Sequence, residues 1–119
     1  MCGITGIVLK KGEDVQKELL LKMTDSMIHR GPDEDGIDLF ENVGIGMRRL
    51  SIMDVASGHQ PFFSNDKRIS VVGNGEIYNH AQLRSGLKND HHFHSSSDIE
   101  VIAPLFLKHG LQFPSLMEG

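Results

Sequence analysis

The chain has 119 residues, of which 39% are hydrophobic and 24% are charged, values that fit a single soluble globular domain rather than a disordered or membrane protein. The formal net charge of −4 argues against a nucleic-acid partner, because binding to phosphates depends on clustered Lys and Arg. No run approaches the roughly 18 apolar residues of a membrane span. Residues 1–10 also lack the pattern of a signal peptide, so we expect no membrane partner and a cytoplasmic protein.

The first elements follow from the hydrophobic pattern of the N-terminal third. Residues 3–9, GITGIVL, alternate small and branched side chains and end at KKGED, which predicts a buried first strand. Asp14 is the expected N-cap of a helix that runs to about Ile28 and ends before HRGPDEDG, where Gly and Pro break it. The apolar stripe of this helix consists of Leu20, Met23 and Met27.

Two further segments are rich in Val and Ile and are bounded by Gly, Asp and Asn. They are VGIGMRRLSIMD at 43–54 and RISVVGNGEIYN at 68–79, and both are predicted strands. The segment between them, 55–66, is typical of a loop, because Pro61 cannot donate a hydrogen bond to a sheet.

Two helices are predicted in the last third of the chain. Asn79 stands at the expected N-cap of a short helix that runs to about Lys88. Ser97 and Glu100 have the spacing of a capping box ahead of a second helix, which Gly110 is expected to end. Strands interleaved with helices predict one compact layered unit of the α/β or α+β class.

Cys2 is the only cysteine of the chain, so it has no partner for an internal disulfide. Removal of Met1 would leave its thiol beside a free α-amine, a base that gains and loses a proton near physiological pH. Nucleophile and general base would then come from one residue. The alternative is that Cys2 is a small apolar residue at the start of a strand.

Asn74 and Gly75 form an Asn-Gly pair beside a strand-like segment. Such a pair is a strong signal for a hairpin turn. The functional alternative uses the Asn74 side-chain amide and the Gly75 backbone N–H as two donors for a developing oxyanion. Taken alone, the pair favours the turn.

Arg49 and Asp98 have complementary chemistry for an α-amino acid. A guanidinium offers a planar fork to a carboxylate, and an aspartate accepts from an ammonium group. Glu76 is a second candidate for the ammonium. Each has an ordinary alternative, since Arg49 and Glu76 would also suit a solvated surface and Asp98 would favour a helix N-terminus.

Six motifs occur in order along residues 1–110: MCGITGIV, HRGPDEDG, RRLSIMD, GHQPFF, GNGEIYNH and SSSDIEV. Together they resemble the N-terminal glutaminase domain of asparagine synthetase, a class II glutamine amidotransferase among the N-terminal nucleophile hydrolases. Glucosamine-6-phosphate synthase and amidophosphoribosyltransferase also begin with Cys-Gly-Ile, but RLSIMD paired with NGEIYNH is more similar to asparagine synthetase. An amidotransferase with another acceptor substrate stays open as an alternative.

The resemblance implies a catalytic role for three residues. The cysteine that matches Cys2 attacks the side-chain amide of glutamine and gives a glutamyl thioester and ammonia. The residues that match Asn74 and Gly75 form the oxyanion hole. Removal of Met1 is expected to create the active form, since the α-amine of Cys2 is otherwise part of a peptide bond.

The resemblance also implies residues that bind glutamine. Arg49 matches the residue that receives the α-carboxylate of the substrate. Asp98, assisted by Glu76, matches the residue that receives its α-amine. Arg30 matches a loop residue at the border of the glutamine pocket.

The resemblance further implies a four-layer αββα sandwich of the α+β class. We expect residues 1–119 to be the N-terminal part of such a domain, truncated at its C-terminus and lacking the synthetase domain, since no Ser-Gly-Gly-x-Asp-Ser loop for ATP is found. No cofactor is expected in this fragment, and ATP and magnesium are expected only for the synthetase domain. Expected partners are glutamine, that domain in a longer chain, and a second copy in a homodimer. A truncated, inactive fragment is the alternative.

A metal site is the rival hypothesis from a different class. His92 and His94 would face one side of a strand, and Asp90 or Asp98 would complete a ligand set. No cysteine pair or paired-histidine motif provides a familiar zinc spacing. We therefore expect no metal, and interpret NDHHFHSSSD as a polar loop.

Overall fold

The computed structural model describes residues 1–51 and 58–119, which fall into two compact units. Of the described residues, the first unit contains 1–51, 59–61 and 72–74, and the second contains 58, 62–71 and 75–119. The sequence predicted a single compact unit. The structure confirms the predicted mixture of helices and strands. It divides them between two compact units, so the prediction of one unit is wrong.

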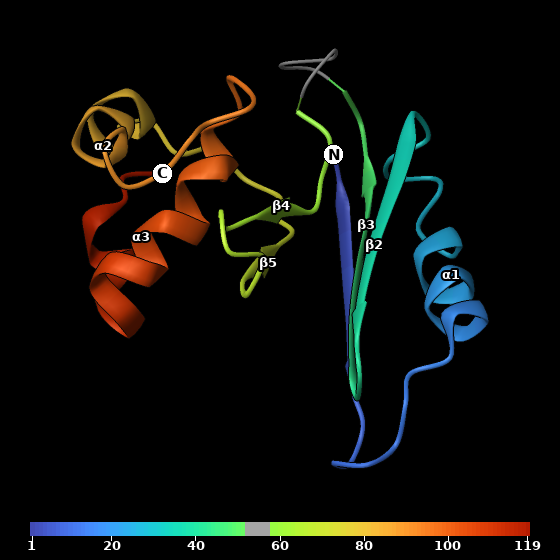
Figure 1. Cartoon of the computed structure of the whole chain (residues 1–119). Coiled ribbons are helices and arrows are strands. Elements are labelled where there is room, and N and C mark those ends of the chain that lie inside the picture. Colours follow the sequence, from blue (N-terminus) through green and yellow to red (C-terminus); the bar gives the residue numbers. More distant parts are fainter. Residues whose placement is uncertain (52–57) are drawn as a thin grey trace. The chain divides into compact units, whose positions relative to one another are not determined.

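The first unit is built on a three-stranded antiparallel sheet covered by one helix (Figure 1). The strands follow the order β1-β3-β2, so the central strand pairs with both others. The bounds of these elements are β1 Gly3–Val8, α1 Lys17–Asp25, β2 Glu34–Phe40 and β3 Val43–Arg49.

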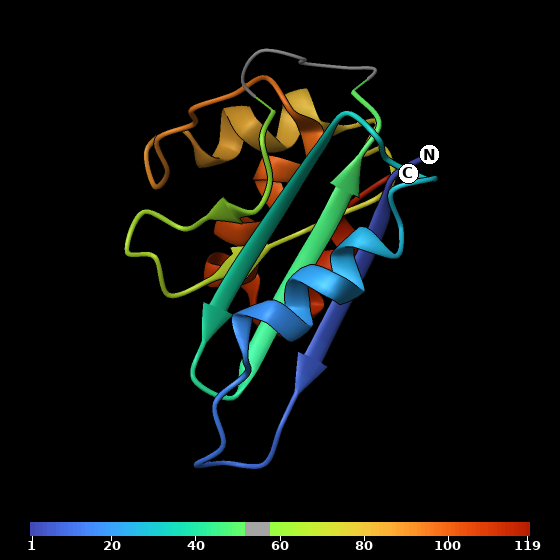
Figure 2. The same cartoon turned by 90° about the vertical axis from the view of Figure 1, so that its right-hand side faces the viewer.

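Helix α1 lies across one face of this sheet, as Figure 2 shows. Two glycines of β3 let it approach closely. A Cβ on Gly46 would lie 2.4 Å from the Thr24 hydroxyl oxygen, and one on Gly44 would lie 3.1 Å from a Leu20 methyl group. Both Thr24 and Leu20 are fully buried. The glycines therefore make room on the strand for the helix, an approach that any larger side chain would block.

Three predictions in the first unit need correction. Strand β1 forms, but it is an edge strand, and Ile4 is 51% exposed, so the predicted burial is wrong. Helix α1 begins at Lys17 with Gln16 as its N-cap, not at Asp14. Strand β2 was not predicted, because EDGIDLF is rich in Asp, Glu and Gly. Pairing along β3 outweighs that low intrinsic strand propensity.

The second unit packs helices around its own apolar core (Figure 1). Its elements are β4 Phe62–Phe63, β5 Ser70–Val71, α2 His80–Leu87, the 3₁₀ helix η1 Asp98–Val101, α3 Ile102–His109 and the 3₁₀ helix η2 Gly110–Leu116. The fully packed members of the core are Phe62, Ile77, Leu87, Ile99, Val101 and Leu105. Helices α2, η1 and α3 thus contribute buried side chains to one cluster, and the partly buried Phe113 of η2 packs against it.

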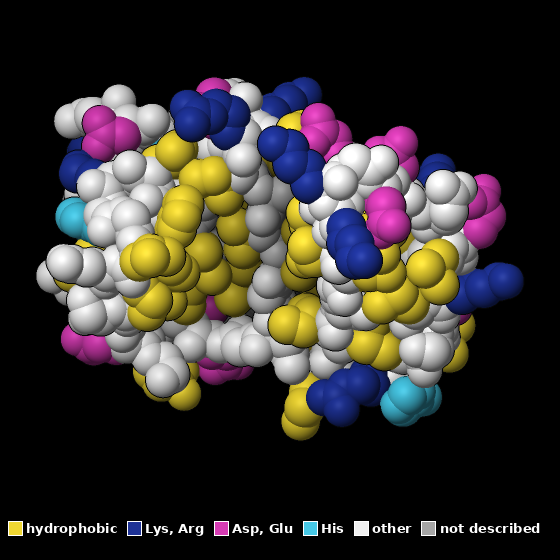
Figure 3. Space-filling model, turned by 90° about the horizontal axis from the view of Figure 1, so that it is seen from below, with side chains coloured by type: hydrophobic (Ala, Val, Ile, Leu, Met, Phe, Trp, Pro, Cys, Tyr) yellow, Lys and Arg dark blue, Asp and Glu magenta, His cyan; other side chains and the backbone are white. Residues whose placement is uncertain are grey.

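Some large apolar side chains of the second unit remain at the surface. Leu107, Leu111 and Leu116, from α3 and η2, are all exposed. On the face drawn in Figure 3, hydrophobic side chains gather in patches among the white backbone and other uncharged side chains. These helices therefore carry more large apolar side chains than the core of the second unit buries.

The predicted strand at 68–79 shortens to the two residues of β5. The backbone after Val71 continues without regular structure to α2. Asn74 and Gly75 therefore do not join two paired strands, and neither has the positive φ that the favoured hairpin turns require. The hairpin interpretation of this pair is wrong. The predicted segment 43–54 gives β3, and its residues 52–54 lie outside the described residues.

The helix ends of the second unit follow the sequence in part. Helix α2 begins after Asn79, as predicted, and α3 ends at Gly110, whose φ of 57° suits glycine. The capping box is wrong, since Ser97 makes no side-chain cap and Glu100 bonds elsewhere. Asn79 also makes no side-chain cap. Its amide binds Leu116 and Glu118 instead, which ties the C-terminal segment to α2.

No helix in the part of the chain that the structure describes is both long and apolar enough to cross a membrane.

Candidate active site

Cys2 lies immediately before β1 and is half-buried. Its sulfur is 3.9 Å from the carbonyl oxygen of Leu50 at the end of β3, a distance that suits only a weak S–H contact. The backbone carbonyl of Cys2 accepts a hydrogen bond of 3.2 Å from Arg30 Nε. The structure therefore brings together two of the predicted site residues, Cys2 and Arg30.

Arg30 also holds the residue in front of the cysteine. Its Nη2 lies 3.0 Å from the Met1 sulfur, and its carbonyl oxygen accepts from the Met1 amine at 3.4 Å. With Met1 in place, the nitrogen of Cys2 is an amide and cannot act as a base. These contacts place Met1 and the backbone carbonyl of Cys2 next to the HRGP segment.

Arg49 is buried at the end of β3, where its guanidinium pairs with the Glu34 carboxylate of β2. The other oxygen of Glu34 contacts His59 Nδ1, and the Ser51 hydroxyl lies 3.4 Å from Oε1. Glu34 thus links β2 with the segment after β3 and with His59. The Arg49 guanidinium, which was predicted to bind the α-carboxylate of the substrate, is therefore already paired in part with the Glu34 carboxylate.

The adjacent arginines of β3 point to opposite faces of the sheet, as alternation along a strand requires. Arg48 faces α1, where its Nε donates to the Gly31 carbonyl at 3.0 Å and its Nη1 lies 3.4 Å from Asp35. Arg48 therefore joins the helix side of the unit, while Arg49 is on the side of Glu34.

The pKa of Glu34 lies below its ordinary value of 4.5. Burial raises the pKa of Glu34, but the hydrogen bonds and charges of Arg49 and His59 together lower this pKa by more than burial raises it. A carboxyl whose native pKa is depressed stabilises the fold above its unfolded pKa and loses this contribution as the pH falls through its native pKa.

We therefore expect a pH-dependent difference in unfolding free energy between the wild type and Glu34→Gln. At pH 7 the variant should be less stable, because the buried Arg49 loses the charge of its half-buried partner. The difference should shrink as the pH falls below 4.5 and disappear only below the lowered native pKa, where Glu34 is neutral in both the folded and the unfolded state. Urea unfolding at pH 7 and at successively lower pH measures it. A difference that stays constant, or grows as the pH falls, would contradict the assignment.

Asn74 follows a backbone position that Gln60 holds firmly. The Gln60 side-chain amide accepts from the Gly73 N–H at 2.7 Å and donates to the Gly73 carbonyl at 3.2 Å. Gln60 itself lies against β2, where a Cβ on Gly36 would come within 1.8 Å of its carbonyl oxygen. Asn74 is exposed. This glutamine belongs to the motif GHQPFF, but no short-range signal in the sequence predicts that it brackets Gly73.

Asp98 begins η1 and is half-buried. Its Oδ2 accepts a hydrogen bond of 2.6 Å from the Ile77 backbone N–H, two residues after Gly75. Glu76 is exposed, and its carbonyl lies close to Gly119. The structure therefore brings Asp98 to the segment that contains Gly75 and Glu76.

The predicted site residues are divided between the two units. The first unit holds Cys2, Arg30, Arg49 and Asn74, and the second holds Gly75, Glu76 and Asp98.

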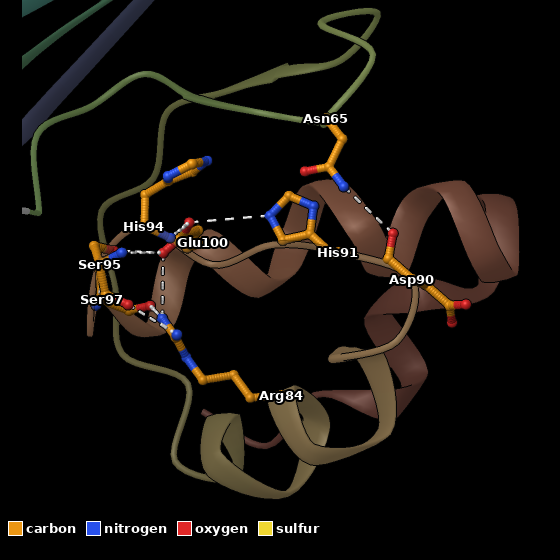
Figure 4. Close-up of polar contacts among 8 residues, drawn as sticks. All are labelled: Asn65, Arg84, Asp90, His91, His94, Ser95, Ser97 and Glu100. Atoms are coloured by element: carbon orange, nitrogen blue, oxygen red, sulfur yellow. Dashed lines mark hydrogen bonds and ion pairs between the residues drawn. The ribbon is translucent and has the colours of Figure 1, made fainter.

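The histidine-rich segment has another arrangement than the rival metal hypothesis required. The rings of His92 and His94 meet edge to face with centroids 4.8 Å apart. Across residues 1–51 and 58–119, no three His, Cys, Asp or Glu side chains are placed to hold a metal ion. The polar groups of this segment instead surround Glu100 (Figure 4).

Comparison with known proteins identifies the class. A family model described as "Glutamine amidotransferase domain" matches residues 1–119. The chain belongs to this family.

Among curated relatives, the chain is similar to plant asparagine synthetases named as glutamine-hydrolyzing. Glutamine-hydrolyzing asparagine synthetase 3 of Arabidopsis thaliana is 39% identical, and the match covers 100% of this chain and 21% of that protein. Relatives from Brassica oleracea and Sandersonia aurantiaca are 43% and 42% identical, with 20% and 23% of their lengths covered. The chain therefore spans about a fifth of the length of the curated relatives that it matches.

Proposed function

We propose that this chain hydrolyses the side-chain amide of glutamine, with Cys2 as the nucleophile. The observation that carries the proposal is the full-length match to the glutamine amidotransferase family, with the single cysteine of the chain at residue 2. Its position before β1, half-buried and next to Arg30, supports that role.

The reaction begins once Met1 is removed and the α-amine of Cys2 is free. The neutral amine takes the thiol proton, and the thiolate sulfur attacks the amide carbon of glutamine. The protonated amine then gives its proton to the leaving nitrogen, so that ammonia departs and a glutamyl thioester remains. A water molecule, deprotonated by the same amine, attacks the thioester and releases glutamate and the thiol.

The tetrahedral intermediate needs donors for its oxyanion. We assign this role to the Asn74 amide and the Gly75 N–H, of which a single donor is typically worth about 3 kcal/mol in such sites. The hold of Gln60 on Gly73 supports the assignment, because it limits the motion of the residue before Asn74.

Substrate binding is assigned to Arg49, Asp98, Glu76 and Arg30. Asp98 and Glu76 receive the α-ammonium, and Arg30 borders the pocket. Arg49 receives the α-carboxylate, which must share the guanidinium with Glu34 or displace it. The burial of Arg49 supports the role, since a partly desolvated guanidinium binds carboxylates more strongly than one in water.

We further propose that the ammonia serves asparagine synthesis, as the names of the relatives indicate for those proteins. The acceptor step, with ATP and magnesium, then belongs to a synthetase domain of a longer chain. The complete glutaminase domain is proposed to be a four-layer αββα sandwich in a cytoplasmic protein, in which two copies form a homodimer. The antiparallel sheet with α1 on one face would supply two of the four layers.

The test is the intact mass of the protein after incubation with an electrophilic glutamine analogue. We expect a species that lacks Met1 and carries one adduct, which peptide mapping places on Cys2. Excess glutamine should protect the thiol from the analogue. A protein that stays unmodified although Met1 has been removed would overturn the proposal, and so would an active preparation in which Met1 is retained.

A further inference from the structure

The side chain of Glu100 is buried, with 3% of its surface exposed, and it faces the segment that precedes it in the sequence. Its carboxylate accepts the His94 N–H at 2.7 Å, the Ser95 N–H at 3.0 Å and the Ser95 hydroxyl at 2.6 Å (Figure 4). A buried carboxylate is tolerated only when its oxygens are satisfied in this way. Glu100 therefore ties the backbone of residues 94–95 to η1.

Arg84 of α2 holds the same segment through its carbonyl groups. Its Nη1 donates to the Ser95 carbonyl at 2.8 Å, and its Nη2 donates to the Ser97 carbonyl. The same Nη2 lies 3.4 Å from Glu100 Oε2, and the guanidinium carbon is 4.4 Å from the centre of the Phe93 ring. The segment is thus fixed at its N–H groups by Glu100 and at its carbonyl groups by Arg84.

His91 lies beside Glu100 but does not neutralise the charge of its carboxylate. Its Nε2 is buried, 3.9 Å from Glu100 Oε1, and has no hydrogen-bond partner among the residues that the structure describes. Burial lowers the pKa of His91, although the charge of Glu100 acts in the opposite direction. At neutral pH, Glu100 is therefore balanced by Arg84 and the two backbone N–H groups rather than by an imidazolium.

The anchored segment leads directly into Asp98. The Ser97 carbonyl that Arg84 holds belongs to the peptide bond that joins Ser97 to Asp98. One residue further, Asp98 Oδ2 meets the Ile77 N–H at 2.6 Å. The position of this carboxylate thus depends on a backbone that Glu100 and Arg84 fix from two sides.

We propose that Glu100 is a positioning residue for glutamine recognition: with Arg84 it holds Asp98 where its carboxylate accepts the α-ammonium of the substrate. This inference rests on the role proposed above for Asp98. Glu100 does not touch the substrate in this scheme, and it acts through the backbone of residues 94–98.

The first measurement compares glutamine with glutaramate, its analogue without the α-amine, in the whole protein. The ratio of the two kcat/KM values reports the contact with the ammonium, because all other groups of the two substrates are shared. In Glu100→Gln we expect this ratio to fall about tenfold, mainly through KM for glutamine, since the loop loses its charged anchor. An equal loss for both substrates would overturn the inference, because it would indicate a merely structural role.

The second measurement needs no catalysis. Amide hydrogen exchange in Glu100→Gln should accelerate about tenfold at His94 and Ser95, and at Ile77, whose N–H depends on Asp98. The Tyr78 N–H, bonded to the Glu118 carbonyl at 2.6 Å, should exchange at its wild-type rate. Unchanged exchange at Ile77 would overturn the inference.

Two further variants complete the design. Asp90→Asn removes the charge of an exposed pair with Lys108, 2.8 Å apart, and should leave both readouts unchanged. Ser95→Ala removes the hydroxyl that donates to Glu100 at 2.6 Å and accepts from the Ser97 N–H at 3.2 Å, and it should shift both readouts in the same direction by about threefold, even if Glu100→Gln fails to fold. A wild type that hydrolyses neither substrate would overturn the proposed function and with it the role in glutamine recognition, whereas the exchange at Ile77 would still decide whether Glu100 positions Asp98.

Discussion

Glutamine hydrolysis should fall by about 10⁴-fold or more when Cys2 is replaced with alanine, because no other thiol exists in the chain to form the thioester. The loss should lie in kcat, while binding of glutamine through Arg49 and Asp98 should persist. Steady-state release of ammonia and glutamine binding by calorimetry measure the two effects separately.

The matched control for this prediction is Cys2→Ser, which keeps a hydroxyl and nearly the same volume. It should also be inactive, since a serine hydroxyl is a weaker nucleophile than a thiol at neutral pH. Both variants should unfold at the wild-type temperature, because the Cys2 sulfur makes only a weak contact of 3.9 Å. Activity retained in Cys2→Ala would exclude the proposed mechanism.

The largest effect on stability is expected for Gly31→Ala. An added Cβ would lie 2.3 Å from the carbonyl carbon of Arg48 and 2.4 Å from the nitrogen of Arg49. Both atoms belong to the backbone of β3 and cannot rotate away, as the end of a side chain could. We expect a loss of about 3 kcal/mol or more in unfolding free energy, measured by urea titration.

The control for that variant is the same substitution at Gly86, near the end of α2. There a Cβ would meet nothing within 4 Å. Alanine should stabilise the helix by about 0.5–1 kcal/mol, because it loses less conformational freedom on folding than glycine. Equal effects at the two sites would show that the close approach at Gly31 is not a constraint.

Local signals were enough to predict several elements of the fold. Helix α2 follows Asn79, as predicted. Helix α3 stops at Gly110, because the end of a helix favours a residue that tolerates positive φ. Strand β3 is confirmed from VGIGMRR, whose Val and Ile residues favour a strand. Cys2 and Arg30 were both selected from their motifs, and the structure brings them into contact.

The remaining features depend on partners that are distant in the sequence. Strand β2 exists because β3 pairs with it, not because its own residues favour a strand. Glu34 was not singled out, since only the fold brings it to Arg49. Glu100 was interpreted as a cap for Ser97, and its actual partners follow from the path of residues 94–95, which no short-range pattern specifies.

The opposite orientation of Arg48 and Arg49 makes the alignment of β3 with its neighbours a condition for recognition. A slip by one residue would exchange the two guanidinium groups between the faces of the sheet. Arg48 would then meet Glu34, and Arg49 would meet the Gly31 carbonyl and the end of α1, now bound by Arg48. The same slip would turn the glycines of β3 away from α1 and place Ile45 and Met47 beneath the helix. A misaligned sheet would therefore pack poorly against α1 and would not form a stable fold. Only the correct alignment, which places Arg49 beside Glu34, is compatible with the packing of the helix.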